Sequence, residues 1–216
     1  RGHYQPRVPA DLGYYDLRVP ETRQAQADMA REYGVEAFCY WHYWFGNGRR
    51  LLERPFNEVL ESGKPDFPFC LAWANHSSRG IYNGVKTKES LIDQTYGGLS
   101  DYERHFYDVL PAFEDKRYVT VDGKPFFLIF APAEIPDSRE FIDCWQRLAA
   151  RNGLTGIHFV SHTYQPNDID NFLSMGYDAV NVVRLFEYQR IGISFVQKVL
   201  NKVNREVFKH GFWCQY

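Results

Sequence analysis

The stretch Phe38–Phe45 reads Phe-Cys-Tyr-Trp-His-Tyr-Trp-Phe, and the chain then turns at Gly46-Asn47-Gly48. Eight consecutive residues that are almost all aromatic are typical of a strand buried on both faces, as in a parallel sheet covered by helices. A strand that only packs a core would use Val and Ile, whereas this one ends in Trp, Tyr and His. The segment therefore predicts a central strand of an α/β fold.

The position of these rings also bears on function. The carboxyl ends of strands in α/β folds face the ligand crevice. Rings with polar edges at that place suit a ligand that has apolar faces and many hydroxyls, of which a sugar is the simplest example. A heavily packed aromatic core explains this one segment equally well.

Strands and helices alternate along the rest of the chain. Further strands are predicted at Phe67–Ala74, Pro125–Phe130, Ile157–Ser161 and Ala179–Val183, with Tyr118–Val121 joined to Pro125–Phe130 through an Asp-Gly hairpin turn. Helices are predicted from Pro20 to Gly34, from Pro55 to Ser62, from a Ser100/Glu103 capping box to Phe113, from an Asp137/Glu140 box to Gly153, through Phe172, and over Val196–Val207.

This alternation predicts an α/β fold of the (β/α)8 TIM-barrel type. A complete barrel needs about 250 residues, and this chain has 216, with a sixth strand beginning only near Gly211. We therefore expect residues 1–216 to form a single partial barrel domain that lacks the first and last strands.

The charge and the cysteine content of the chain argue against some classes of partner and cofactor. The net charge is −2 and the isoelectric point is near 6.4, which argues against a nucleic-acid partner. The four cysteines lie tens of residues apart without metal-binding spacing, so no metal and no cofactor is expected. Cys39 and Cys70 lie in apolar runs and are expected to be buried, reduced thiols, which favours a cytoplasmic protein. Neither a membrane-spanning stretch nor a signal peptide is found.

Polar groups at the predicted strand ends are the candidates for ligand contact. A lone strand histidine such as His42 is more often a hydrogen-bonded core residue than a ligand. Asn75 and His76 give a stronger signal, because a polar run begins there directly after a buried strand. His162 ends a later strand. Asp178 begins its strand, on the stability face of a barrel, and is therefore interpreted as structural.

Catalytic residues cannot be assigned from these candidates. Glycosidic chemistry normally needs two carboxylates, and the strand ends offer only Glu134 and Glu187. No Ser/His/Asp order, phosphate loop or metal motif is present.

Several segments together closely resemble the WbsX-type glycosyltransferase-like family, which is related to the family 99 glycoside hydrolases that include endo-α-mannosidases. The segments are Gly2–Pro6, Asp11–Arg18, Gly34–Phe45, Leu51–Pro55, Pro68–Asn75 and Val121–Pro125. The resemblance implies a (β/α)8 barrel that acts on bacterial surface polysaccharide, encoded among lipopolysaccharide or capsule genes.

The chain departs from this family pattern in four respects. Many members read Trp-Ala-Asn-Glu where this chain has His76 after Asn75, and many carry a Glu near the position of Asn181. The related hydrolases place catalytic glutamates in an Asn-Glu-x-x-Glu-Gly-like motif, which is absent here. The family's opening strand is also absent. We expect a piece of a longer protein, with an inactive homologue as the alternative.

The leading hypothesis is a carbohydrate-active enzyme, a glycosyltransferase or endo-glycosidase. Its substrate would be a glycan, a nucleotide-sugar or a lipid-linked saccharide. Trp44 and Trp73 would stack on sugar faces, and Tyr40, His42 and Trp44 would share one strand face. The predicted substrate-binding residues are Tyr40, His42, Trp44, Trp73, Asn75, His76 and His162.

Two alternatives stay open: a glycan-binding or assembly protein without catalysis, and a barrel whose partner domain supplies the chemistry. A partial barrel also leaves sheet edges unpaired, so self-association through those edges is expected of the isolated chain.

Overall fold

The computed structural model describes residues 7–79 and 90–184. The chain divides into two compact units, Arg1–Asn181 and Val182–Tyr216. The first unit contains the sheet and the helices discussed below. The predicted helix over Val196–Val207 and the predicted strand at Gly211 lie outside the described residues, and the assignment of the whole chain to one domain stays a prediction.

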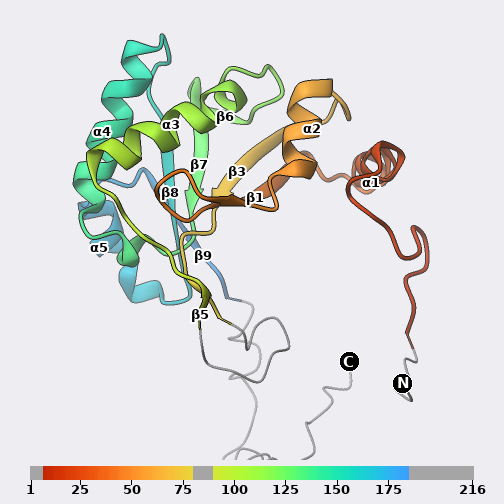
Figure 1. The fold of residues 1–216 in the computed structure, drawn as a ribbon, viewed down its shortest axis with the longest axis horizontal. Helices are drawn as coiled ribbons and strands as arrows, with labels where there is room; N and C mark the ends of the chain where they lie inside the picture. Colours follow the sequence, from red (N-terminus) through yellow and green to blue (C-terminus); the bar gives the residue numbers. More distant parts are fainter. Residues whose placement is uncertain (1–6, 80–89, 185–216) are drawn as a thin grey trace, which may run out of the picture. The chain divides into compact units, whose positions relative to one another are not determined.

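The first unit is built on one sheet, whose strands run in the order β2-β1-β3-β7-β8-β9 (Figure 1). Neighbours β1 to β3, β3 to β7 and β7 to β8 pair in parallel, and β6 forms a hairpin with β7. The strands are β1 Phe38–Trp44, β2 Arg50–Leu51, β3 Phe69–Trp73, β6 Thr120–Val121, β7 Lys124–Ile129, β8 His158–Thr163 and β9 Ala179–Val182; β4 Ser78–Arg79 and β5 Ser90–Ile92 form a separate ribbon.

Helices alternate with these strands as the sequence predicts. They are α1 Pro20–Glu32, α2 Arg54–Ser62, α3 Leu99–Phe113, α4 Ser138–Arg151 and α5 Ile169–Ser174, with short 3-10 turns at Pro132–Glu134 and Pro166–Asp168. The Asp137 cap is confirmed, because its carboxylate accepts the backbone N–H of Glu140 at 2.9 Å. The Ser100 cap is wrong: α3 begins at Leu99, and its N-cap position is occupied by Gly98, two residues before Ser100.

One face of the sheet is covered by α3 and α4 (Figure 1). Trp145 of α4 is fully buried, and its ring centroid lies 4.8 Å from those of Phe127 and Phe141. Phe106 of α3 and Phe159 of β8 complete the centre of this layer. Burying a side chain of this size contributes about 2–3 kcal/mol to folding, so the helix–sheet layer is the principal core.

The turn after β1 is tied to α3. Gly46 has a φ of 88°, and a Cβ atom there would lie 2.4 Å from Thr95 Oγ1, so only glycine fits. The Phe45 carbonyl accepts both the N–H and the hydroxyl of Thr95. Asp101 at the start of α3 accepts the backbone N–H of Asn47 at 2.7 Å. These contacts fix the carboxyl end of β1.

The parallel strand order and the β/α alternation are confirmed, whereas the closed eight-stranded barrel stays a prediction. One expectation about β1 is wrong. The strand was expected to be buried on both faces, but in the described residues Cys39 and Trp41 are exposed while His42 and Trp44 are buried. Strand β3 is buried along its whole length, as predicted.

Candidate functional site

Tyr40, His42 and Trp44 share one face of β1, as the alternation of a strand predicts, but that face packs against the helices. The ring centroid of Tyr40 lies 5.2 Å from that of Phe56 in α2. Trp44 stacks on His105 of α3, with ring centroids 4.8 Å apart. These three side chains therefore face the helix layer, and their assignment to a sugar-binding floor stays a prediction.

His42 is half of a buried histidine pair. Its Nε2 lies 2.9 Å from Nε2 of His105, and both side chains are at most 5% exposed. Burial lowers the pKa of His42 to about 3 and that of His105 well below its ordinary value. Both rings are therefore neutral near pH 7, and one Nε2–H donates to the other Nε2. His42 is a core residue with a satisfied hydrogen bond.

Trp73 and Asn75 are also structural. Trp73 is 1% exposed, and its indole N–H donates to the Trp44 carbonyl at 2.9 Å. The Asn75 amide N–H groups donate to the Tyr96 hydroxyl and the Ala131 carbonyl, and its oxygen accepts the Ala131 N–H at 2.7 Å. Asn75 is fully buried. Both side chains are hydrogen-bonded within the chain, and their assignment to substrate contacts stays a prediction.

The opposite face of the sheet carries a second set of rings at the carboxyl ends of the strands. Phe130, directly after β7, lies between Trp41 of β1 and His162 of β8, with ring centroids 5.4 and 4.9 Å away. His76, which follows β3, is 5.0 Å from Phe130, and Tyr164 is 5.0 Å from His162. We call these five residues the aromatic–histidine cluster.

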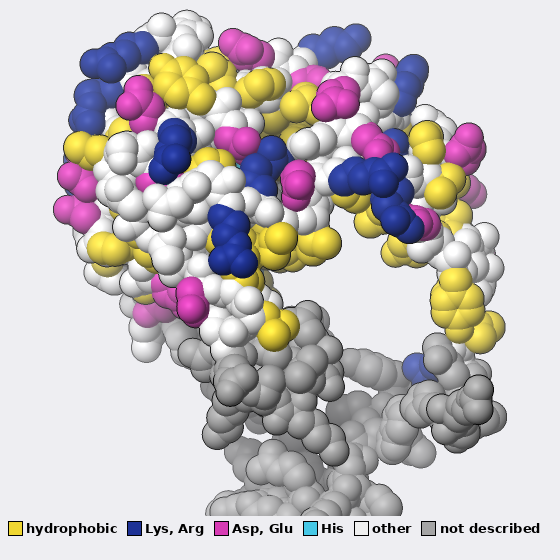
Figure 2. Space-filling view, viewed as in Figure 1, with side chains coloured by type: hydrophobic (Ala, Val, Ile, Leu, Met, Phe, Trp, Pro, Cys, Tyr) yellow, Lys and Arg dark blue, Asp and Glu magenta, His cyan; other side chains and the backbone are white. Residues whose placement is uncertain are grey.

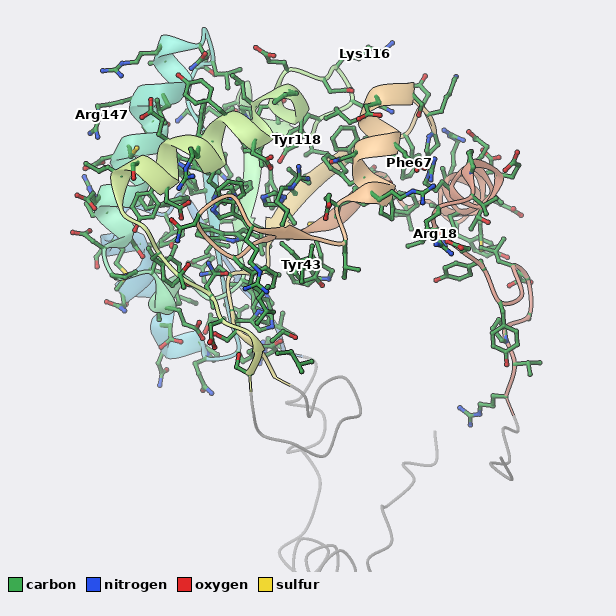
Figure 3. The ribbon with its side chains drawn as sticks, viewed as in Figure 1. Arg18, Tyr43, Phe67, Lys116, Tyr118 and Arg147 are labelled. Atoms are coloured by element: carbon green, nitrogen blue, oxygen red, sulfur yellow. The ribbon has the colours of Figure 1, made fainter. Side chains whose placement is uncertain are left out.

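The cluster is partly open to solvent. Trp41 is 50% exposed and Tyr164 45%. Trp41 also lines a largely apolar groove of about 540 Å³, together with Cys39, Tyr43 and Phe56. Tyr43, two residues beyond Trp41, points away from α2 and α3 in Figure 3. Exposed rings with an adjoining groove provide a surface on which a ligand can lie.

His162 presents a polar atom with no partner at this surface. Its Nδ1 accepts the amide N–H of Asn181 in β9 at 3.1 Å, which leaves the ring proton on Nε2. Nε2 is buried and has no hydrogen-bond partner among the described residues. Burial lowers the pKa of His162, so the ring is neutral near pH 7. An unpaired buried N–H costs free energy that a ligand oxygen would recover.

His76 contributes a second such atom. Its Nδ1 is buried and has no partner in the described part of the chain, although the residue as a whole is only half-buried. His76 and His162 are thus the two sequence-predicted residues that the structure brings together, both in ring contact with Phe130. Their assignment to substrate contacts stays a prediction.

Sequence reasoning missed Trp41 and Phe130. The strand β1 is aromatic at both odd and even positions, so alternation alone does not tell which set faces the helices. Phe130 is the last residue of an apolar run and carries no polar signal. Asn181 is noted in the sequence as a position near which many family members carry Glu, and the structure adds its bond to His162.

The described residues contain no group of His, Cys, Asp or Glu suited to hold a metal ion. None of the described helices is long and apolar enough to cross a membrane.

Basic and acidic side chains are interspersed on the face shown in Figure 2.

Comparison with known proteins shows which family the chain belongs to. The sequence pattern described as "Glycosyltransferase WbsX" matches residues 1–212. The WxcX proteins of two strains of Xanthomonas campestris pv. campestris are each 35% identical to this chain over 180 residues, which is 82% of this chain and 25% of theirs. The chain thus spans about a quarter of the length of these relatives.

Solved structures share the fold at low sequence identity. The GH99 endo-alpha-mannosidase from Bacteroides thetaiotaomicron has a TM-score of 0.56 and 14% identity, and the match covers 81% of this chain and 47% of that one. A protein titled "Glycoside hydrolase-like protein" has a TM-score of 0.59 and 14% identity, covering 90% and 62%.

Proposed function

Because the chain belongs to the WbsX glycosyltransferase family, we propose that it binds a glycan at the aromatic–histidine cluster, as part of an enzyme acting on a bacterial surface polysaccharide. The substrate would be a glycan chain of lipopolysaccharide or capsule, or its nucleotide-sugar or lipid-linked precursor. The observation that carries this proposal is one site with two features: Trp41 is half-exposed, and Nε2 of His162 has no hydrogen-bond partner among residues 7–79 and 90–184.

The chemistry of a sugar matches both features. The C–H face of a pyranose is apolar and packs on an exposed indole, while its hydroxyls accept and donate hydrogen bonds. The His162 Nε2–H, held in place by Asn181, would donate to a sugar oxygen. His76 Nδ1 would exchange a further hydrogen bond with a hydroxyl.

A second candidate function is glycan binding without catalysis. Neither the described residues of the cluster nor Asn181, which bonds His162, is a carboxylate. His76 and Asn181 stand where many family members carry glutamate. Release of reducing ends from a bound oligosaccharide by the full-length protein supports the enzyme. Binding without release or transfer supports the second function.

A cytoplasmic location belongs to the same proposal. Cys39, Cys70 and Cys144 are free thiols in the structure, and free thiols persist in reducing compartments. Fractionation of cells that express the full-length protein tests this location.

Binding is tested with α-mannan oligosaccharides and O-chain oligosaccharides, titrated calorimetrically into the full-length protein. Trp41→Ala is expected to weaken binding by about tenfold or more, which corresponds to ~1.4 kcal/mol. His162→Gln is expected to weaken it about fivefold, the contribution of one hydrogen bond.

The matched control is Tyr107→Ala. Tyr107 lies on α3 and is 46% exposed, close to the 50% of Trp41, but it is outside the cluster. Its substitution should leave affinity unchanged. Equal losses for Trp41→Ala and Tyr107→Ala, or no loss for either, would refute the site.

A further inference from the structure

We propose that Cys39 and Cys70 form a redox-reactive dithiol, which a hydroperoxide converts to a disulfide between β1 and β3. This inference is independent of the proposed glycan site. It rests on the pairing of the two strands and on the different surroundings of the two thiols.

The strand register brings the two thiols together. Cys39 pairs directly with Cys70 in the parallel ladder of β1 and β3. Directly paired residues of neighbouring strands point to the same face, and their Cα atoms lie about 4.8 Å apart. That separation falls within the range of about 4.4–6.8 Å found between the Cα atoms of disulfide-linked cysteines. Both cysteines are free thiols in the structure.

The two surroundings assign different roles to the thiols. Cys39 is exposed and lines the groove of about 540 Å³ beside Trp41, so a small oxidant can reach it. Cys70 is 7% exposed. The Cys70 thiol lowers the pKa of Cys39, whereas the pKa of Cys70 itself is raised by Cys39 and by burial. Cys39 therefore has the character of the attacking thiolate, and Cys70 stays a protonated thiol.

The chemistry proceeds in two balanced steps. The Cys39 thiolate attacks one peroxide oxygen, the O–O bond breaks, and Cys39 becomes a sulfenic acid while the peroxide leaves as an alcohol or water after taking up a proton. The Cys70 sulfur then attacks the Cys39 sulfur, and hydroxide leaves with the Cys70 proton as water. The sulfur pair loses two electrons and the peroxide gains them.

Peptide mapping tests the pairing. The full-length protein is treated with hydrogen peroxide, alkylated and digested with trypsin without reduction. We expect peptide 32–49 linked to peptide 51–79, each of which contains one cysteine, with the loss of two hydrogen atoms and reversal by dithiothreitol. Cys144→Ser is the matched control, because Cys144 is buried in α4, and it should leave the link unchanged.

Two further variants separate the roles. In Cys70→Ser, Cys39 lacks its partner and should be driven on to the sulfinic acid, whereas in Cys39→Ser the buried Cys70 should stay reduced. Phenylarsine oxide, which needs two adjacent thiols, should bind the untreated protein and neither variant. Oxidation of Cys39 to sulfinic acid in the unmodified protein while Cys70 stays reduced would overturn the proposal, as would no reaction at either residue.

Discussion

The histidine pair His42–His105 should make folding sensitive to mild acid. The perturbation is a shift from pH 7 to pH 5. Burial lowers the pKa of His42 from 6.5 to about 3 and lowers that of His105 well below the same value. The unfolded chain therefore binds more protons than the native one below pH 6.5, and the free energy of unfolding falls as the pH falls.

The size of the effect follows from the shift. Each group contributes about 1.4 kcal/mol for every pH unit between the unfolded and the folded pKa. At pH 5 the contribution lost is about 2 kcal/mol per histidine, or about 4 kcal/mol for the pair. This is a large part of the ~5–15 kcal/mol that stabilises a typical domain.

Urea unfolding followed by tryptophan fluorescence measures this loss at pH 7, 6 and 5. The double variant His42→Gln/His105→Gln removes both titrating groups and retains side chains that can hydrogen-bond. Between pH 7 and pH 5 its free energy of unfolding should therefore fall by about 4 kcal/mol less than that of the unmodified protein. His158→Gln, at a half-buried histidine of β8 outside the pair, is the control. The same pH dependence in the unmodified protein and the double variant would refute the reasoning.

Two further predictions concern the fold. Asn75→Ala should lower the free energy of unfolding by about 2–4 kcal/mol, because it removes the amide hydrogen bonds to Tyr96 and Ala131 and leaves the Ala131 N–H unpaired; exposed Asn171→Ala should change it by less than about 0.5 kcal/mol, and equal effects in chemical denaturation would contradict this account. Residues 1–216 expressed alone should dimerise or aggregate through open sheet edges; light scattering during size-exclusion chromatography checks this, and a monomer with a cooperative melt would contradict it.

The element pattern was predictable because local signals agreed with the fold. The Asp122-Gly123 dipeptide predicts the hairpin, and the structure gives both residues positive φ, 51° and 76°. Asp137 predicts a helix cap that is present. Asp178, interpreted as structural, accepts the Phe159 N–H at 2.8 Å and so ties β8 to the start of β9. Each of these features depends on a few neighbouring residues.

The site was harder to predict because it depends on which strand face meets the helices. His42 and Trp41 are adjacent in an all-aromatic strand, and only tertiary packing sends His42 to α3 and Trp41 to the open face. Asn75 satisfies its amide with Ala131, a residue 56 positions away in the chain. Cys39 was expected to be buried and is exposed, for the same reason as Trp41.

A structure of the full-length protein with a bound oligosaccharide tests the central claim most directly. The account predicts a sugar ring packed against Trp41, with an oxygen within hydrogen-bonding distance of His162 Nε2. A bound glycan that touches neither residue, or that lies on the helix-covered side of β1 with His42 and Trp44, would contradict it.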